Sequence, residues 1–173
     1  MSQAYSYRLD PTIPSFPDEK PLFIYDGHCV LCSGWVQTVL RLDKKGRFRM
    51  LAAQSPLGQA IYVHYGLDPV HHDTNLVLLN GVAYTKSRSS IIIVASLGFP
   101  WTLARVGLLV PRAMLDRLYE LVARNRIRWF GKHEHCMLSL AGYETRFLTG
   151  DFSVAVTPDA VTPPAASLPG CTI

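Results

Sequence analysis

The stretch Lys20-Pro-Leu-Phe-Ile-Tyr-Asp-Gly-His-Cys-Val-Leu-Cys32 decides the fold of this chain. Its first part, Lys20–Tyr25, is a short apolar run with one β-branched and two aromatic residues, which is typical of a strand buried on both faces. Asp26-Gly27 ends this strand. From Ser33 onward, apolar residues recur at helical spacing as far as Asp43. The stretch therefore predicts a strand, a loop with two cysteines and a helix.

The residues downstream predict the remainder of a small α/β domain. Asn80-Gly81 tolerates the positive φ angles of a type I′ turn and stands between two apolar runs, so we expect a β-hairpin there. Ser55-Pro56 has the N-cap and first-turn residues of a helix. Strands are expected at 47–51, 75–79 and 82–85, and helices at 55–66, 91–97 and 111–131. This order predicts an α/β, thioredoxin-like fold, in which helices cover a central mixed sheet of about four strands, with an extra C-terminal helical extension.

The two ends of the chain differ in composition from its middle. Residues 1–19 and 150–173 are rich in proline and small residues, whereas 20–149 holds the predicted strands and helices. A chain of 173 residues fits one domain. We therefore expect one thioredoxin-like domain at 20–149, between an N-terminal tail and a Pro/Ala-rich C-terminal tail that drape over it or stay mobile.

Charge and the N-terminal residues limit the class of protein and its compartment. Seventeen basic and thirteen acidic residues give a net charge of +4, which is too mild to indicate nucleic-acid binding. The N-terminus lacks the pattern of a secretory signal, so a reducing, cytoplasmic location is expected. In that compartment the four cysteines are not expected to form structural disulfides. The Cys-x-x-Cys spacing then indicates redox chemistry or a metal.

The stretch Ser89–Pro111 is nearly uncharged and about as long as a membrane-spanning helix. Gly98-Phe99-Pro100 interrupts it near the middle, and Arg105 lies in its second half. The stretch therefore predicts two shorter buried helical pieces and no membrane span.

Cys29 and Cys32 are the predicted catalytic pair. At the N-terminus of the first helix, unpaired backbone N–H groups and the positive end of the helix dipole favour a Cys29 thiolate and lower its pKa. Cys32 lies one turn later on the face of Val36 and Val39, so it is expected to point inward while Cys29 stays at the rim. Cys29 then attacks a thiol or disulfide, and Cys32 resolves the mixed disulfide. This chemistry needs no cofactor, but it needs a protein or small-molecule substrate and a cellular reductant for recycling.

Three neighbours of the pair are further candidates. Gly27 allows a sharp turn and a close approach of a substrate backbone to the sulfur. Asp26 could shuttle a proton for Cys32, or it could form only an Asx-type turn with Gly27. His28 could place charge beside the thiolate, or it could be a solvated loop residue, which is the simpler interpretation.

The segment Tyr25–Cys32 resembles the DCC family of thiol–disulfide oxidoreductases, which is named for an Asp-Cys-Cys signature. Tyr84–Ser87 is similar to the middle motif of that family, Pro111–Cys136 to its C-terminal signature and Arg146–Leu148 to its usual end. The resemblance covers residues 20–148, and several ordered motifs are more specific than a single Cys-x-x-Cys. It implies a thioredoxin-like fold with the two cysteines as the redox pair.

One departure from related folds concerns substrate docking. Thioredoxins use a cis-proline before the third strand to dock the substrate backbone. Asp73-Thr74-Asn75 occupies this place in the chain. We therefore do not expect this chain to dock a substrate backbone through a cis-proline at this place.

Two sets of residues on the last helix each have two interpretations. The charged and polar set could attract an acidic partner or the carboxylates of glutathione, although a solvated helix face is the simpler interpretation. The aromatic set could form a groove for a peptide, although aromatic residues at helical spacing are more often in the core. The first set comprises Arg124, Asn125, Arg126 and Arg128, and the second comprises Tyr119, Trp129 and Phe130.

Two alternatives to redox catalysis remain open. Zinc could bind Cys29 and Cys32 together with a second group, made of His133, His135 and Cys136, although its spacing is not a ligand signature. Cys136 could instead be a buried small hydrophobic residue or a second resolving thiol. The chain could also be an interaction module that keeps the fold without catalytic turnover.

Overall fold

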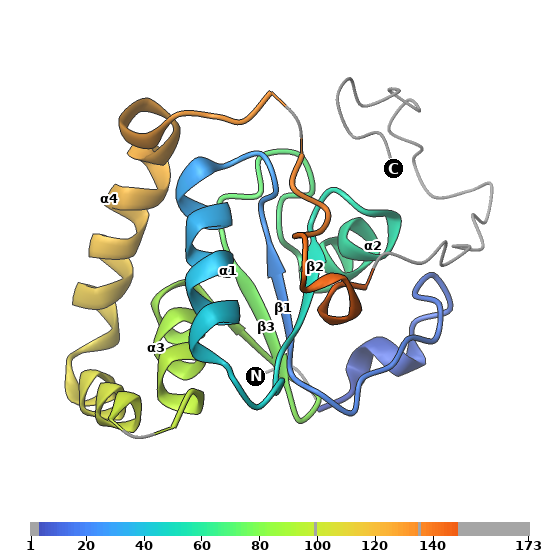
Figure 1. Ribbon diagram of the computed structural model, residues 1–173, viewed down its shortest axis with the longest axis horizontal. Coiled ribbons are helices and arrows are strands. Elements are labelled where there is room, and N and C mark those ends of the chain that lie inside the picture. The colour runs from blue at the N-terminus through green and yellow to red at the C-terminus, as the bar shows by residue number, and fades with distance from the viewer. Residues whose placement is uncertain (1–3, 99, 135, 149–173) are drawn as a thin grey trace.

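The computed structural model describes residues 4–98, 100–134 and 136–148 (Figure 1). The strands are β1 (Leu22–Tyr25), β2 (Arg49–Ala52), β3 (Leu76–Leu79) and β4 (Val82–Thr85). They form one mixed sheet in the order β2-β1-β3-β4. β1 runs parallel to β2 and antiparallel to β3, which forms a hairpin with β4. The C-terminal tail expected at 150–173 lies outside the described residues.

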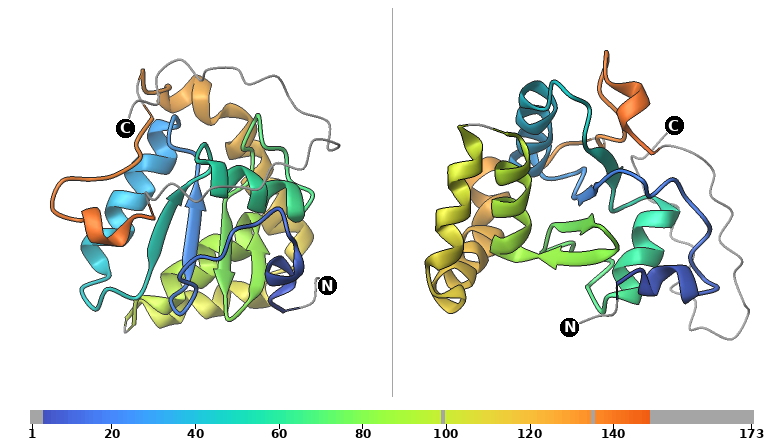
Figure 2. Two further views of the ribbon diagram at one scale, coloured as in Figure 1. Left: turned by 90° about the vertical axis from the view of Figure 1, so that its right-hand side faces the viewer. Right: turned by 90° about the horizontal axis from the view of Figure 1, so that it is seen from below.

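Helices cover both faces of this sheet, which confirms the predicted α/β, thioredoxin-like architecture. The α-helices are α1 (Val30–Leu42), α2 (Pro56–His64), α3 (Lys86–Ser96) and α4 (Arg112–Phe130). Shorter 3-10 helices are η1 (Ser6–Leu9), η2 (Trp101–Leu109) and η3 (Glu144–Arg146). α1 and α3 lie on one face and α2 on the other, while α4 packs outside α1 and α3 (Figures 1 and 2).

Strand β1 lies between two cores. Phe23 and Tyr25 face the core built with α1, whereas Leu22 and Ile24 face the core built with α2. None of the four residues is more than 1% exposed, which confirms a strand buried on both faces. Because β1 ends at Tyr25, the loop with the two cysteines starts from a tightly held part of the fold.

The N-terminal segment packs on the α2 side of the sheet. Tyr7, Ile13 and Phe16 belong to the core on that side. The Tyr7 hydroxyl also donates a hydrogen bond to Oδ2 of Asp18 (2.6 Å). From residue 4 onward, the expected N-terminal tail therefore drapes over the domain, away from the start of α1 (Figure 1).

Two local signals gave the structure that they predict. The β3–β4 hairpin turns through Asn80 and Gly81, whose φ angles of 50° and 75° are both positive, as a type I′ turn requires. At the start of α2, Oγ of Ser55 accepts a hydrogen bond from the N–H of Gly58 (3.1 Å), and Pro56 is the first helical residue. Both predictions are confirmed.

The apolar stretch at 89–111 forms the greater part of α3 and the whole of η2. Within the described part of the chain, no helix is long and apolar enough to cross a membrane. The prediction of two buried pieces is wrong for η2, because Trp101, Leu103 and Leu109 are exposed there. These side chains are exposed because η2 lies at the outer edge of the molecule, where α3 covers only one of its sides (Figure 1).

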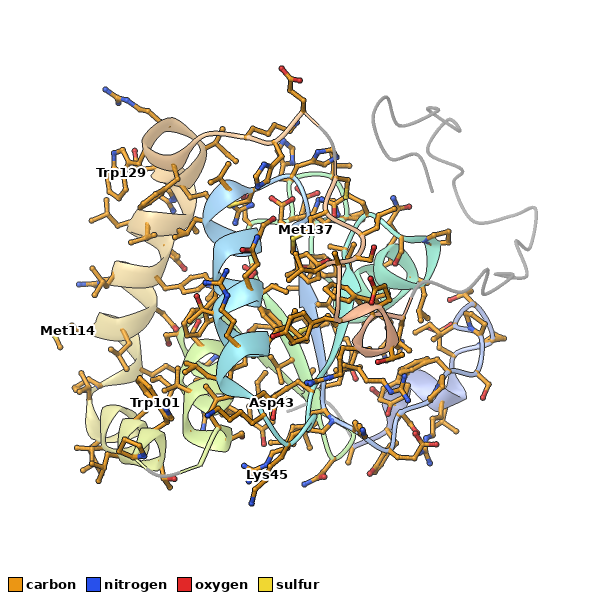
Figure 3. All side chains as sticks on the ribbon, viewed as in Figure 1. Asp43, Lys45, Trp101, Met114, Trp129 and Met137 are labelled. Atoms are coloured by element: carbon orange, nitrogen blue, oxygen red, sulfur yellow. The ribbon has the colours of Figure 1, made fainter. Side chains whose placement is uncertain are left out.

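α4 exposes more apolar surface than its sequence predicts. Trp129 and Phe130, expected in the core, are 54% and 49% exposed. Figure 3 shows Trp129 and Met114 pointing away from the body of the molecule. α4 turns the face of Tyr119 and Arg126 toward the domain, whereas Trp129 and Phe130 are the last two residues of the helix and lie past these contacts.

Candidate functional site

The two cysteines lie where the loop after β1 becomes α1. Cys29 is the N-cap residue, with extended backbone (φ −79°, ψ 120°), and Cys32 lies in the first turn. The backbone N–H of Cys32 donates a hydrogen bond to Sγ of Cys29 (3.3 Å). A thiolate at this position accepts the bond as a capping oxygen does, and the helix dipole favours its negative charge.

The environment separates the pKa values of the two thiols. Hydrogen bonding from the Cys32 thiol, followed by its backbone N–H and the charge of Arg126, lowers the pKa of Cys29 to about 7, while burial and Asp26 oppose this shift. The pKa of Cys32 is raised, because its thiol hydrogen-bonds to Cys29, because it is buried, and because negative charge on Cys29 lies close. At neutral pH this favours a thiolate on Cys29 and a protonated thiol on Cys32.

Both cysteines are buried, with Cys29 0% and Cys32 5% exposed. The inward position of Cys32 agrees with its helical register, but the prediction that Cys29 stays at the rim is wrong. The chain that follows α4 turns back over the cysteine loop, and Lys132 forms a β-bridge with Cys29. We call the described residues 131–134 and 136–137 the cover. Figure 1 shows this part of the chain crossing the start of α1.

Hydrogen bonds from backbone and side chains hold the cover in place. The N–H of His133 donates to the carbonyl oxygen of His28 (2.8 Å), and the N–H of Met137 donates to that of Gly27 (3.0 Å). The hydroxyl of Tyr25 donates to the carbonyl oxygen of Met137 (2.6 Å). His28 therefore contributes its backbone carbonyl to the covering of the site.

Gly27 lies directly under the cover. A Cβ placed on Gly27 would lie 2.6 Å from Sγ of Cys136, 3.0 Å from the carbonyl oxygen of Met137 and 3.2 Å from Oε1 of Gln54. All three distances are too short for an ordinary contact. In this structure the close approach that requires glycine is made by the chain itself, where the sequence suggested a substrate backbone.

Gly27→Ala is expected to push the cover outward. The free energy of unfolding should fall by about 1–2 kcal/mol, because the added methyl group overpacks the site. Alkylation of Cys29 in the native protein should become faster. Urea unfolding and peptide mass spectrometry after brief alkylation measure the two effects. Adding Cys136→Ala removes the nearest atom and should restore part of the stability, whereas an unchanged alkylation rate would contradict this role of the cover.

Asp26 is buried and accepts hydrogen bonds from three donors. Its Oδ1 accepts from the backbone N–H of His28 (3.0 Å) and from Nε2 of Gln54 (2.7 Å). Its Oδ2 accepts from Nη2 of Arg126 (2.9 Å). The bond from His28 is an Asx-type turn, one of the two alternatives that the sequence offered. Gln54 also accepts from the N–H of Gly27 (3.0 Å), so the loop is fixed from both sides.

Arg126 belongs to this site, although the sequence favoured a solvated face for it. It is only 4% exposed, and Nη2 also donates to the carbonyl oxygen of His72 (3.0 Å). The prediction of a solvated face is therefore wrong for Arg126. The helical register of the sequence could have predicted the inward position of Arg126. Arg126 follows Tyr119 by seven residues and Val122 by four, so it lies on the face of α4 that packs inward.

Arg124 and Asn125, the two predicted substrate-binding residues of this helix, are placed differently. The Arg124 side chain is 80% exposed, and its Nη2 lies 3.9 Å from Oε2 of Glu120. Nδ2 of Asn125 donates to the carbonyl oxygen of Leu121 (2.8 Å). Both sets of contacts lie within α4, so the structure does not bring these residues to the cysteines.

Tyr119 connects α4 to the chain just before β3. Its hydroxyl accepts a hydrogen bond from the N–H of Asn75 (3.0 Å), in the segment that stands where thioredoxins have the cis-proline. Burial raises the pKa of Tyr119 to about 12, the bond from Asn75 opposes the shift, and charge on Cys32 adds to it. The phenol therefore stays protonated, and the backbone donor of Asn75 is already bonded within the chain.

The second group of the zinc alternative is only partly within the structure. His135 lies outside the described residues. Among the residues that are described, no three His, Cys, Asp or Glu side chains gather as metal ligands. Cys136 is partly buried, and its thiol donates to Oε1 of Gln54 (3.6 Å), so it borders the loop of Asp26 and Gly27.

Comparisons with known proteins place the chain among its relatives. The chain is 35% identical over 127 residues to the uncharacterized protein YuxK of Bacillus subtilis (strain 168), which covers 73% of this chain and 93% of that protein. It is 32% identical over 122 residues to the DCC family protein At1g52590, chloroplastic, of Arabidopsis thaliana, which covers 70% of this chain and 71% of that protein. A search of solved structures found no significant match.

A family comparison matches the part of the chain that contains almost all of the sheet, the cysteine loop and all four α-helices. The family described as DCC1-like thiol-disulfide oxidoreductase matches residues 23–132, which include both cysteines, Asp26 and Arg126. The chain therefore belongs to the DCC1-like family of thiol–disulfide oxidoreductases.

Proposed function

We propose that Cys29 is the nucleophile and Cys32 the resolving thiol of this oxidoreductase. The Cys29 thiolate attacks a substrate disulfide R–S–S–R′, forms the mixed disulfide Cys29–S–S–R and releases R′S⁻. Cys32 then loses its proton and attacks Sγ of Cys29, which closes the Cys29–Cys32 disulfide and releases RS⁻. The substrate gains two electrons and the protein loses two, and a cellular thiol reductant returns them.

The observation that carries this assignment is the hydrogen bond from Cys32 to Sγ of Cys29 at the start of α1. It supports a pKa of about 7 for Cys29, so about half of this thiol is ionised at neutral pH. The raised pKa of Cys32 supports the second role, because a resolving thiol should stay protonated until the mixed disulfide has formed.

Burial of Cys29 requires that the cover moves before a substrate can reach the sulfur. Two backbone hydrogen bonds, from His133 and Met137, attach the cover to the cysteine loop. Each contributes about 0.5–1.5 kcal/mol of net stability. We propose that local opening at a cost of a few kcal/mol precedes each turnover, and that Gly27 and His28 then border the bound substrate.

We propose positioning roles for Asp26 and Arg126. Asp26 already accepts from Gln54, His28 and Arg126, and these contacts support a fixed anchor more than a proton shuttle for Cys32. The hydrogen bonds from Cys32 lower the pKa of Cys29 most; Arg126 lowers it further and Asp26 raises it, so the ion pair adjusts the ionisation of the nucleophile. Arg124 and Asn125 are left out of the proposed site because their contacts lie within α4.

The proposed substrate is a protein or small-molecule disulfide, and the proposed setting is a reducing, cytoplasmic one. We propose a dithiol resting form, because a reducing setting keeps both thiols reduced. A dithiol of this kind needs a thiol reductant for recycling.

The pH dependence of thiol alkylation tests the assignment of the two cysteines. The alkylation rate of Cys29 should rise with pH and reach half its maximum near pH 7, because only the thiolate reacts and its pKa is about 7. Cys32 should react much more slowly at the same pH. Iodoacetamide labelling followed by quantitative mass spectrometry of the two peptides measures both rates. Equal reaction of the two thiols with a midpoint of about 8.5, the value of free cysteine, would remove the assignment.

Trapping of a mixed disulfide tests turnover itself. Cys32→Ser should hold a substrate on Cys29, because no resolving thiol can release it, and the adduct should disappear when a reductant is added. The double variant Cys29→Ser/Cys32→Ser is the matched control and should hold none. A folded Cys32→Ser protein that forms no adduct with a model disulfide would favour the non-catalytic interaction module instead.

A further inference from the structure

The outward face of α4 carries two parallel rows of side chains. On a helix with 3.6 residues per turn, one row is apolar and the other, beside it, is basic. The apolar residues are all more than half exposed: Met114 (60%), Leu118 (60%), Leu121 (54%) and Trp129 (54%). The basic row comprises Arg117, Arg124 and Arg128, all of them exposed. We call these seven residues the outer face.

The acidic residues of α4 leave most of the positive charge of the outer face unpaired. Between residues 112 and 133 the only acidic residues are Asp116 and Glu120. Asp116 accepts a hydrogen bond from Ser87 (2.5 Å), and Glu120 pairs with Lys86 (2.6 Å), so both are engaged with α3. Glu120 makes only a longer contact with Arg124 (3.9 Å). In the described part of the chain, Arg117 and Arg128 make no ion pair.

The apolar surface continues onto η2. Leu103, Val106 and Leu109 are each more than 60% exposed. Figures 1 and 2 show η2 and α4 together along one edge of the molecule. A monomeric soluble protein seldom exposes this many large apolar side chains on neighbouring elements without a binding partner for them.

We propose that the outer face docks on an anionic lipid surface, with α4 lying in the plane of the membrane interface. An exposed helix with adjoining apolar and arginine rows matches this setting, because the apolar side chains enter the acyl boundary while the guanidinium groups reach the phosphates. Trp129 at the end of the helix suits the same boundary. In this arrangement α4 lies along the membrane surface and does not cross it.

Charge argues for lipid over a second copy of the chain. Two outer faces placed together would bring their arginine rows close, and the acidic side chains that could compensate are already bonded to α3. An anionic lipid surface instead supplies negative charge along the whole row.

Vesicle co-sedimentation with the full chain tests the proposal. The protein should bind vesicles of phosphatidylcholine and phosphatidylserine, and it should bind pure phosphatidylcholine vesicles at least about tenfold more weakly. Salt at about 0.5 M should weaken the binding, because it screens the exposed arginines.

Matched variants distinguish the effect of the basic row on vesicle binding from the effect of the net charge of the protein. Arg117→Gln/Arg128→Gln should lower the affinity for anionic vesicles about 30-fold, as expected for two charges at the surface. Lys44→Gln/Lys45→Gln removes the same charge from the end of α1, away from the outer face, and should change the affinity by less than about threefold (Figure 3). Equal losses from the two pairs would overturn the proposal.

A second pair of variants tests the apolar row. Leu121→Gln/Trp129→Gln should lower binding about tenfold, whereas Val63→Gln, at an exposed position of α2 on the other side of the sheet, should not. All of these positions are exposed, so the variants should fold, which circular dichroism can verify. Equal binding to neutral and anionic vesicles would overturn the proposal. So would a dimer in light scattering that Leu121→Gln dissociates, in a protein that binds no vesicles.

Discussion

Arg126→Met is expected to lower the free energy of unfolding by about 3–5 kcal/mol, because it leaves the buried carboxylate of Asp26 without its charged partner. The two side chains lie 2.9 Å apart, and neither is more than 8% exposed. The same change should raise the pKa of Cys29, since Arg126 lowers that pKa and Asp26 raises it. Urea unfolding measures the first effect, and the pH midpoint of Cys29 alkylation measures the second.

The matched control for this prediction is Arg124→Met in the same helix. The Arg124 side chain is 80% exposed and lies 3.9 Å from Glu120, so its ion pair is worth little. We expect a change of less than about 0.5 kcal/mol in the free energy of unfolding and no movement of the Cys29 midpoint. Similar losses from Arg124→Met and Arg126→Met would contradict the special position of Arg126.

The double variant Asp26→Asn/Arg126→Met separates the ion pair from general damage. With both charges removed, no buried charge is left unpaired, so the double variant should be more stable than Arg126→Met alone. The Cys29 midpoint should also move back toward the wild-type value, because the opposing charge of Asp26 is gone. A double variant less stable than Arg126→Met would show that these side chains act mainly through other contacts.

Elements with a local signal could be predicted from the sequence. Asn80-Gly81 carries its turn preference in two adjacent residues, and Ser55-Pro56 carries a helix start in the same way. The apolar run that forms β1 is similarly local. The parallel pairing of β1 with β2 follows from the order of the elements, because a helix joins the two strands.

The site combines parts that local patterns do not connect. The two cysteines and their place at the start of a helix could be predicted, because four adjacent residues contain them. Asp26 and Arg126 are 100 residues apart, and a helical register gives the face of an arginine but not its partner. The position of the cover is harder still to predict from the sequence. The hydrogen bonds from His133 and Met137 use backbone groups, and these are the same whatever the side chains are. The sequence therefore does not predict the burial of Cys29.

The second large effect on stability is expected at Gly58 in α2. A Cβ at this residue would lie 2.4 Å from the carbonyl oxygen of Ala52 and 2.9 Å from both Cα and the carbonyl oxygen of Ala53. These are backbone atoms at the end of β2, so they cannot rotate away as a side chain would. Gly58→Ala should therefore force α2 away from the sheet and lower the free energy of unfolding by about 3 kcal/mol.

Gly34→Ala in α1 is the matched comparison for Gly58→Ala, because both residues lie within α-helices. Among the described residues, and apart from the backbone of α1 itself, no atom lies within 4 Å of a Cβ placed at Gly34, and the residue is exposed. Alanine there removes the entropic cost of a helical glycine, so the free energy of unfolding should rise by about 0.5–1 kcal/mol. Urea unfolding of the two variants should give shifts of opposite sign. Equal changes would mean that helix propensity, and not the contact of α2 with the end of β2, determines the response at Gly58.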